Sequence, residues 1–141
     1  MSASAPLRAR IAESFARQSI MATLQAELAE VAPGRVRITA PLLPGFGQQH
    51  GAGHAGVTFA LGDSAAGYAA LTLIPEGREV MTVEMKINLL APALGQRLVA
   101  SGEVLRAGRR LVIVRATVEA LRDTGPVAIA ELLGTMIPVD A

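Results

Sequence analysis

Residues 50 to 73 contain a single formal charge, Asp63, within the most apolar part of the chain. No charged side chain precedes Asp63 back to Arg37, and none follows it before Glu76. Burial disfavours the ionised form of a carboxyl group and raises its pKa, which suits a group that takes up a proton. Asp63 is therefore a candidate general base or nucleophile. The alternative is a structural aspartate that is bonded to a serine or a backbone group.

The helix that carries Asp63 is predicted to begin next to His54. The backbone N–H groups of Ala55, Gly56 and Val57 would then be unpaired at the positive end of the helix dipole. Such groups can stabilise the oxyanion that develops when a carbonyl group is attacked. The alternative is that water caps them, as it does at most helix ends.

Three other motifs fit their chemistries poorly. Ser64 lies in a predicted helix, and Ala66 stands where a nucleophile elbow needs glycine. His50 and His54 have the spacing of a zinc-binding pair, but two glycines lie between them and the glutamate is missing. The glycine-rich residues 45 to 56 are not followed by the lysine of a phosphate loop. We therefore expect no metal site and no cofactor.

The composition excludes several classes of protein. A net charge of +1, with three Phe, one Tyr and no Trp, argues against a nucleic-acid partner. The absence of cysteine excludes disulfides and a thiol nucleophile. No apolar span suits a membrane helix and no secretory signal is evident, so we expect a cytoplasmic protein without a membrane partner. With 51% hydrophobic and 18% charged residues, we expect part of the surface to be covered by copies of the same chain.

The periodicity of apolar residues predicts one α+β domain over residues 1 to 141. Residues 7 to 17 have the pattern of an amphipathic helix. Residues 22 to 42 contain a proline-glycine turn and then alternate, which predicts a hairpin. Residues 54 to 73 are apolar nearly all round, as in a helix that a sheet encloses.

Four strands are predicted after this helix. They span residues 79 to 90, 97 to 106, 110 to 122 and 126 to 137. In the first of them the alternation places Met81, Val83, Met85, Ile87 and Leu89 on one face and Thr82, Glu84, Lys86 and Asn88 on the other. Tight turns separate the last three, which are therefore expected to be antiparallel neighbours.

The run QQHGAGHAGVTFALGDSAAGYAA, followed by VMTVEMKINLLAPALGQRLVASGEVLRAGRRLVIVRATV, resembles the PaaI-like branch of the hotdog-fold acyl-CoA thioesterases. The resemblance covers most of the chain from about Val31 onwards. In that family the central helix starts with a His-Gly-Gly-like motif. An acidic residue follows the histidine by nine positions, and an amide side chain precedes the histidine by six. A later strand has the form T/S-V-E/D-x-K/N-I/L-N. The resemblance implies a hotdog fold, in which a curved antiparallel sheet of five to six strands wraps a long central helix, with an N-terminal helix.

The resemblance also assigns roles to individual residues. His54, Ala55 and Gly56 match the helix start, Asp63 the catalytic acid, Gln48 the upstream amide and Thr82 the hydroxyl that supports the acid. Ala55 replaces the usual first glycine, and Gln48 stands where many relatives have asparagine. Family members pair their sheets edge to edge as dimers, commonly stack into tetramers, and place each active site between two subunits. A homodimer is therefore the expected minimal active unit, and a homotetramer the expected assembly.

The expected reaction is hydrolysis of an acyl-CoA thioester. Asp63 would activate water as a general base or attack directly to form an anhydride, and the sequence leaves both routes open. Arg106, Arg109 and Arg110 share one turn, which either contacts the phosphates of CoA or is simply solvated. The rest of the pocket is expected to be lined by apolar residues such as Phe46, Phe59 and Tyr68.

Two other functions stay open. A hotdog dehydratase acting on acyl thioesters would need a longer, proline-rich interval before the acid, which residues 54 to 63 lack. A non-catalytic acyl-CoA sensor would have no need of an acid at position 63.

Overall fold

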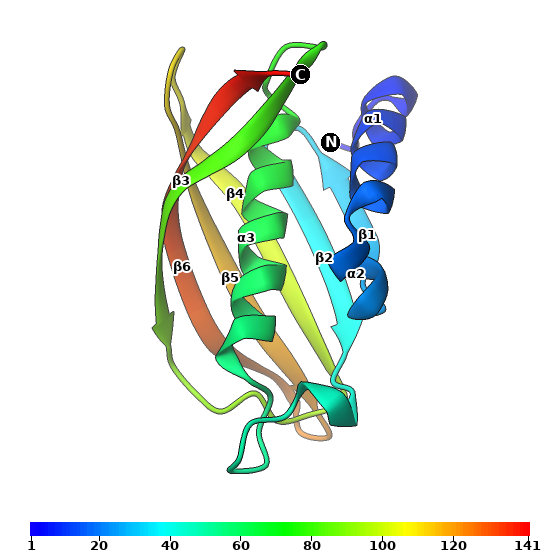
Figure 1. Ribbon diagram of the computed structural model, residues 1–141, viewed down its shortest axis with the longest axis vertical. Coiled ribbons are helices and arrows are strands. Elements are labelled where there is room, and N and C mark those ends of the chain that lie inside the picture. The colour runs from blue at the N-terminus through cyan, green and yellow to red at the C-terminus, as the bar shows by residue number, and fades with distance from the viewer.

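The computed structural model describes residues 1–141 as one curved six-stranded antiparallel sheet with a long helix across one face (Figure 1). The helices are α1 (Ala5–Arg17), α2 (Ser19–Thr23), the short 3-10 helix η1 (Pro44–Phe46) and α3 (Ala55–Leu71). The strands are β1 (Glu27–Ala32), β2 (Arg35–Pro41), β3 (Arg78–Leu89), β4 (Arg97–Ala107), β5 (Val112–Arg122) and β6 (Gly125–Asp140). The predicted hotdog fold is confirmed. None of the helices has the length and apolar character needed to cross a membrane.

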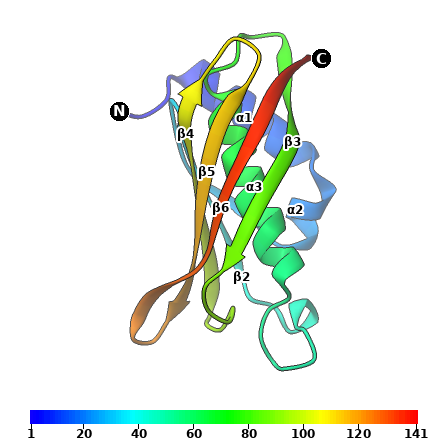
Figure 2. The same ribbon diagram turned by 90° about the vertical axis from the view of Figure 1, so that its left-hand side faces the viewer.

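The order of strands in the sheet is β1-β2-β4-β5-β6-β3, so β1 and β3 form its two edges. Figure 2 shows β4, β5, β6 and β3 side by side, with nothing paired to the far edge of β3. The predicted hairpin is confirmed as β1 and β2, although Ala22 and Thr23 belong to α2. The last three strands are antiparallel neighbours, as predicted.

α3 lies at the centre of the core because its residues are small and apolar on nearly every side. The sheet comes very close to it at Gly102 of β4, where an added Cβ would lie 2.3 Å from the backbone carbonyl carbon of Ala65. Only glycine allows a backbone approach of this kind. The predicted buried helix is confirmed, with His54 as its N-cap and Thr72 as its C-cap.

A β-bulge in β3 changes which side chains face α3. The register against β6 shifts between Thr82 and Glu84, which leaves Val83 as the extra residue. Before the bulge Thr82 faces α3, and after it odd-numbered side chains such as Ile87 pack against the core. The prediction of one continuous apolar face is therefore wrong, since Met81 and Val83 are 59% and 56% exposed. An extra residue in one strand reverses the alternation beyond it.

α1 is the predicted amphipathic helix, and it buries Ile11 completely against the core. The Arg10 guanidinium donates to three backbone carbonyl groups in residues 74 to 78, at 2.6 to 3.1 Å. Gln18, the C-cap of the helix, donates from Nε2 to the Tyr68 hydroxyl at 2.7 Å. These contacts hold α1 against α3 and the loop after it, and Ser14 of α1 lines the space beside Asp63.

Candidate active site

Two pockets contain the candidate acid and the candidate oxyanion donors that the sequence singled out. The Asp63 pocket, of about 190 Å³, is lined by Ser14, Gln18, Asp63, Ser64, Gly67, Tyr68, Glu79, Val80, Thr82 and Met136. The Ala55 pocket, of about 520 Å³, is lined by Gln48, Gln49, Ala52, Gly53, His54, Ala55, Thr58, Leu89, Leu90, Ala91, Pro92, Ala93 and Ile129. No residue belongs to both pockets. One protomer therefore holds the proposed acid and the proposed oxyanion site in separate places.

Asp63 is half-buried on α3, and its carboxylate faces β3. The Thr82 hydroxyl donates a hydrogen bond to Asp63 Oδ1 at 2.8 Å. Burial raises the pKa of the Asp63 carboxyl above its ordinary value, and the hydrogen bond from Thr82 offsets part of that rise. A carboxylate with a raised pKa is a stronger base than an exposed one. Asp63 is thus suited to accept a proton.

The N-terminus of α3 has fewer free N–H groups than the sequence led us to expect. The Gly56 N–H donates to Nδ1 of its N-cap His54 at 2.8 Å, and the Val57 N–H donates to the His54 carbonyl oxygen at 3.0 Å. The expectation of three unpaired groups is therefore wrong for two of them. The His54 side chain caps the helix and takes up the Gly56 N–H, as capping side chains commonly do. Of the three groups, only the Ala55 N–H has no acceptor within the chain.

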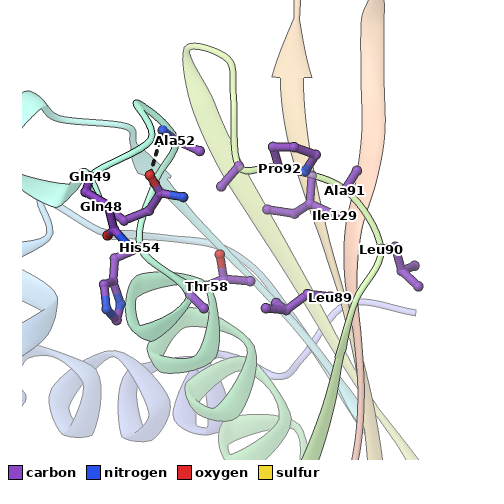
Figure 3. Close-up of a pocket in the computed structure, with 13 residues that line it drawn as sticks. Gln48, Gln49, Ala52, His54, Thr58, Leu89, Leu90, Ala91, Pro92 and Ile129 are labelled. Carbon is purple, nitrogen blue, oxygen red and sulfur yellow. Dashed lines mark hydrogen bonds between the residues drawn. The ribbon is translucent and has the colours of Figure 1, made fainter.

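His54 contributes to the site by shaping the helix end. Its Nδ1 accepts the Gly56 N–H, so in the neutral ring the proton lies on Nε2. Figure 3 shows the ring turned away from the side of the helix on which Thr58 and Leu89 lie. The geometry therefore gives His54 a structural role at the start of α3.

The side chain of Gln48 is held in one orientation by the loop that precedes α3. Its Oε1 accepts a hydrogen bond from the backbone N–H of His50 at 2.5 Å. It also accepts one from the backbone N–H of Ala52 at 3.3 Å (Figure 3). Both of these groups are donors, so they must be met by the amide oxygen and not by the NH₂ group. The NH₂ group of Gln48 is thus left free to donate to a bound molecule in the Ala55 pocket.

Thr58 also lines the Ala55 pocket, and the sequence analysis did not single it out. Its hydroxyl points into the pocket from the first turn of α3 (Figure 3). A signal for it was present in the sequence. Thr58 comes three residues after Ala55, on the same side of the helix, and it is the one polar side chain between residues 55 and 62.

Asp63 and the Ala55 N–H of the same chain cannot act together on one bond. Eight residues of helix separate them, which corresponds to about 12 Å along the axis. A reacting carbonyl group must lie about 3 Å from each group that acts on it.

The three arginines expected near CoA lie at the far end of the molecule. Arg106, Arg109 and Arg110 are exposed at the β4–β5 hairpin, and Figure 1 shows this hairpin and the N-terminus of α3 at opposite ends. Within one protomer they cannot contact a ligand held at Ala55. The spacing of the arginines along the chain carries no information about this separation.

The three aromatic residues expected to line one pocket are placed apart. Tyr68 lines the Asp63 pocket, but its hydroxyl is hydrogen-bonded by Gln18 and by Ser14. Phe46 lies near His54 on the outer side of the helix end, and Phe59 lines neither pocket. Within one protomer, Phe46, Phe59 and Tyr68 therefore do not line one pocket together, and their contact with the substrate stays a prediction.

The residues considered for other chemistries are not assembled into a second site. Ser64 lines the Asp63 pocket from the middle of α3, and neither His50 nor His54 lines that pocket. No group of three or more histidine, aspartate or glutamate side chains is arranged to hold a metal ion.

Comparison with known proteins places this geometry in a family. Residues 50–126 match the model of the thioesterase superfamily. The chain is 30% identical over 110 residues, 77% of each sequence, to a Saccharolobus solfataricus protein provisionally named an esterase. A crystal structure of a thioesterase family protein from Silicibacter pomeroyi matches with a TM-score of 0.93 and 41% identity, covering 96% of this chain and 99% of that one.

The PaaI protein of the E. coli phenylacetic acid degradation operon has the same fold, with a TM-score of 0.85, 16% identity, and coverage of 96% of this chain and 94% of that one. The family resemblance drawn from the sequence is confirmed by these matches. The chain belongs to the thioesterase superfamily, and its fold is the hotdog fold of that family.

Proposed function

We propose that the protein hydrolyses acyl-CoA thioesters to a free acid and CoA. The observation that carries the proposal is the half-buried Asp63, which has a raised pKa and a hydrogen bond from Thr82. The Ala55 pocket supplies two free donors for a carbonyl oxygen, the Ala55 N–H and the NH₂ group of Gln48. Family membership supports a thioester as the substrate.

The two halves of the site come together if two copies pair through β3. This strand is a free edge of twelve residues. Thr82, beside Asp63, lies near its start, and Leu89, in the Ala55 pocket, is its last residue. An antiparallel two-fold pairing centred between Met85 and Lys86 places Thr82 of one copy opposite Leu89 of the other. Asp63 of one subunit then approaches the Ala55 pocket of its partner.

The exposed side chains of β3 and the segment after it support this pairing. Met81, Val83, Leu89 and Leu90 are each 56 to 59% exposed. A long, unpaired edge strand with apolar side chains favours association with another strand. We therefore propose a homodimer as the minimal active unit and a homotetramer as the assembly. The exposed Arg106, Arg109 and Arg110 would contact the phosphates of a CoA bound to another subunit.

The reaction follows from these positions. The Ala55 N–H and the Gln48 NH₂ group polarise the thioester carbonyl and stabilise its oxyanion. In one route Asp63 takes a proton from water as the water oxygen attacks the carbonyl carbon. In the other, the Asp63 carboxylate attacks to form a mixed anhydride that water then opens. In both routes the C–S bond breaks and its electron pair stays on sulfur. The CoA sulfur takes its proton from protonated Asp63 in the first route and from water in the second.

The direct test measures release of free thiol from short, medium and aryl acyl-CoAs. Asp63→Asn should lower kcat by about 10² to 10⁴-fold, because the amide can neither accept a proton nor attack. The variant should stay folded. Burial raises the pKa of the Asp63 carboxyl, so above that pKa the buried negative charge lowers the stability of the folded state. The amide of the variant has no charge, so this loss of stability is absent at neutral pH.

Asp123→Asn is the matched control, since Asp123 is exposed in the β5–β6 turn and should keep full activity. Full activity of Asp63→Asn would remove the acid from the mechanism. Tight acyl-CoA binding by a wild-type protein that releases no thiol would favour the sensor. A hydrated or enoyl product would favour the dehydratase.

A further inference from the structure

Thr58 is a buried residue whose hydroxyl has no hydrogen-bond partner in the protein. Only 1% of the residue is exposed, and its hydroxyl forms no hydrogen bond within the chain. Nε of Arg78 is the one side-chain nitrogen or oxygen that is both completely buried and without a partner. The Thr58 hydroxyl oxygen is not completely buried, so it belongs to the small exposed part of the residue, which faces the Ala55 pocket. A buried polar group without a partner is unfavourable unless a ligand or water supplies one.

The position of Thr58 on α3 aims this hydroxyl at the free end of the helix. Side chains of a helix tilt towards its N-terminus, so the Thr58 side chain lies over the turn that begins at Ala55. Figure 3 shows its oxygen directed into the space between Gln48 and the segment that carries Ala91 and Pro92. Three groups able to donate a hydrogen bond thus belong to residues that line one pocket: the Ala55 N–H, the Gln48 NH₂ group and the Thr58 hydroxyl.

Thr72, a second buried threonine at the C-cap of α3, has the hydrogen bonds of a structural residue. The Thr72 hydroxyl donates to the Ala69 carbonyl oxygen at 2.6 Å and accepts the Gly34 N–H at 2.7 Å. Threonine within a helix commonly bonds a carbonyl group of the preceding turn in this way. The Thr58 hydroxyl makes no such bond, although carbonyl groups of the preceding turn are close to it.

We infer that Thr58 is a further oxyanion donor, whose hydroxyl hydrogen-bonds the carbonyl oxygen of the bound thioester beside the Ala55 N–H. The inference rests on the proposed function, because it takes the ligand of the Ala55 pocket to be a thioester. It adds a residue that neither the charge pattern nor the family motif indicated. Such a donor acts mainly on the transition state, in which the oxygen carries the most charge.

The test compares Thr58→Val with Thr58→Ser in the thiol-release assay. Valine keeps the shape and the buried methyl group but removes the hydroxyl, so kcat should fall on the order of 10²-fold with little change in KM. Serine keeps the hydroxyl and should restore most of the activity. Thr72→Val is the matched control, and it should lower Tm while kcat stays unchanged.

Activity of Thr58→Val within twofold of wild type would overturn the inference, as would equal losses in the Val and Ser variants. If Thr58→Val does not fold, Thr58→Ala and Thr58→Ser are compared instead, because they differ only by the hydroxyl. A loss confined to the Ala variant supports the inference, and equal activities overturn it.

A binding experiment separates failure of this inference from failure of the proposed function. In an Asp63→Asn background, affinity is measured for an acyl-CoA and for the matching S-alkyl-CoA, which lacks the carbonyl oxygen. Thr58→Val should abolish a preference for the acyl compound that Thr58→Ser retains, whether or not the wild-type protein hydrolyses thioesters. An unchanged preference in Thr58→Val would overturn the role of Thr58 even if wild-type hydrolysis is observed.

Discussion

Asp63 lies on a buried apolar helix, and Thr82 lies on an edge strand of the sheet. The helix removes much of the water around the carboxylate, and the strand supplies one hydroxyl donor at 2.8 Å. The two effects on the pKa of Asp63 are opposed, and desolvation is the larger. Thr82 therefore sets how far the pKa of the acid rises, as well as where its oxygen points.

A pH profile tests this balance. Thr82→Val removes a hydrogen bond to the ionised carboxylate, so the pKa of Asp63 should rise further. The active base is the ionised form, so activity is lost as pH falls through the pKa. The acid limb of kcat/KM in the wild type should thus lie above the range of an ordinary aspartate, and in Thr82→Val it should move to higher pH.

The control for this profile is Thr135→Val, in which the hydroxyl lost is the one that donates to Glu84 at 2.8 Å. It should leave the acid limb in place. An acid limb that is the same in Thr82→Val and in the wild type would show that another group controls the profile.

At the scale of elements, the first residue of α3 offers a way to delete one N–H without breaking the helix. Ala55→Pro removes the only free backbone donor of that end, and proline is well tolerated at the first position of a helix. His54 already has the extended backbone, at φ −65° and ψ 139°, that a residue before proline prefers. Thiol release should fall by about 10²-fold or more, while Tm changes little.

Circular dichroism and Tm measured beside the activity show whether the helix end survives in Ala55→Pro. Wild-type activity in the folded variant would exclude the Ala55 N–H as an oxyanion donor.

The contact between α3 and β4 makes a second prediction at this scale. An alanine Cβ at Gly102 would overlap the backbone of Ala65, so helix and sheet must move apart. We expect Gly102→Ala to lower the free energy of unfolding by about 3 kcal/mol or more. Gly67→Ala is the matched control, because its Cβ would meet only Met136 at an ordinary 3.8 Å, and it should stabilise the helix by about 0.5–1 kcal/mol. Denaturant titration measures both, and a neutral Gly102→Ala would contradict the packing described.

At the scale of the whole molecule, the separation of the two pockets predicts complementation between subunits. Homodimers of Asp63→Asn or of Ala55→Pro have a defect in each of their two sites. A heterodimer of the two variants combines the intact Asp63 of one chain with the intact helix end of the other, and its second site carries both defects. Isolated heterodimers, obtained by co-expression with two different tags, should therefore show about half of the wild-type activity per dimer. Heterodimers as inactive as either homodimer would place each site within one chain.

The long helices, the strands and the candidate acid could be predicted from the sequence alone. A helical period predicted α1, a long run that is apolar nearly all round predicted α3, and a period of two predicted the four strands after α3. One charge in the apolar run identified Asp63. These features are local, because they depend on neighbours a few residues away and on the burial of a single helix. The short helix α2 was missed because its five residues are too few to show a period.

The way in which the groups of the site face one another depends on the folded chain. The bulge at Val83 turns Thr82 towards Asp63, the loop before α3 takes up the oxygen of Gln48, and His54 takes up the N–H of Gly56. Each of these depends on the register between strands or on a hydrogen bond within a folded loop. Shifting a strand by one residue moves every side chain to its other face, and one capping bond removes a donor, so the sequence pattern alone could not distinguish these outcomes.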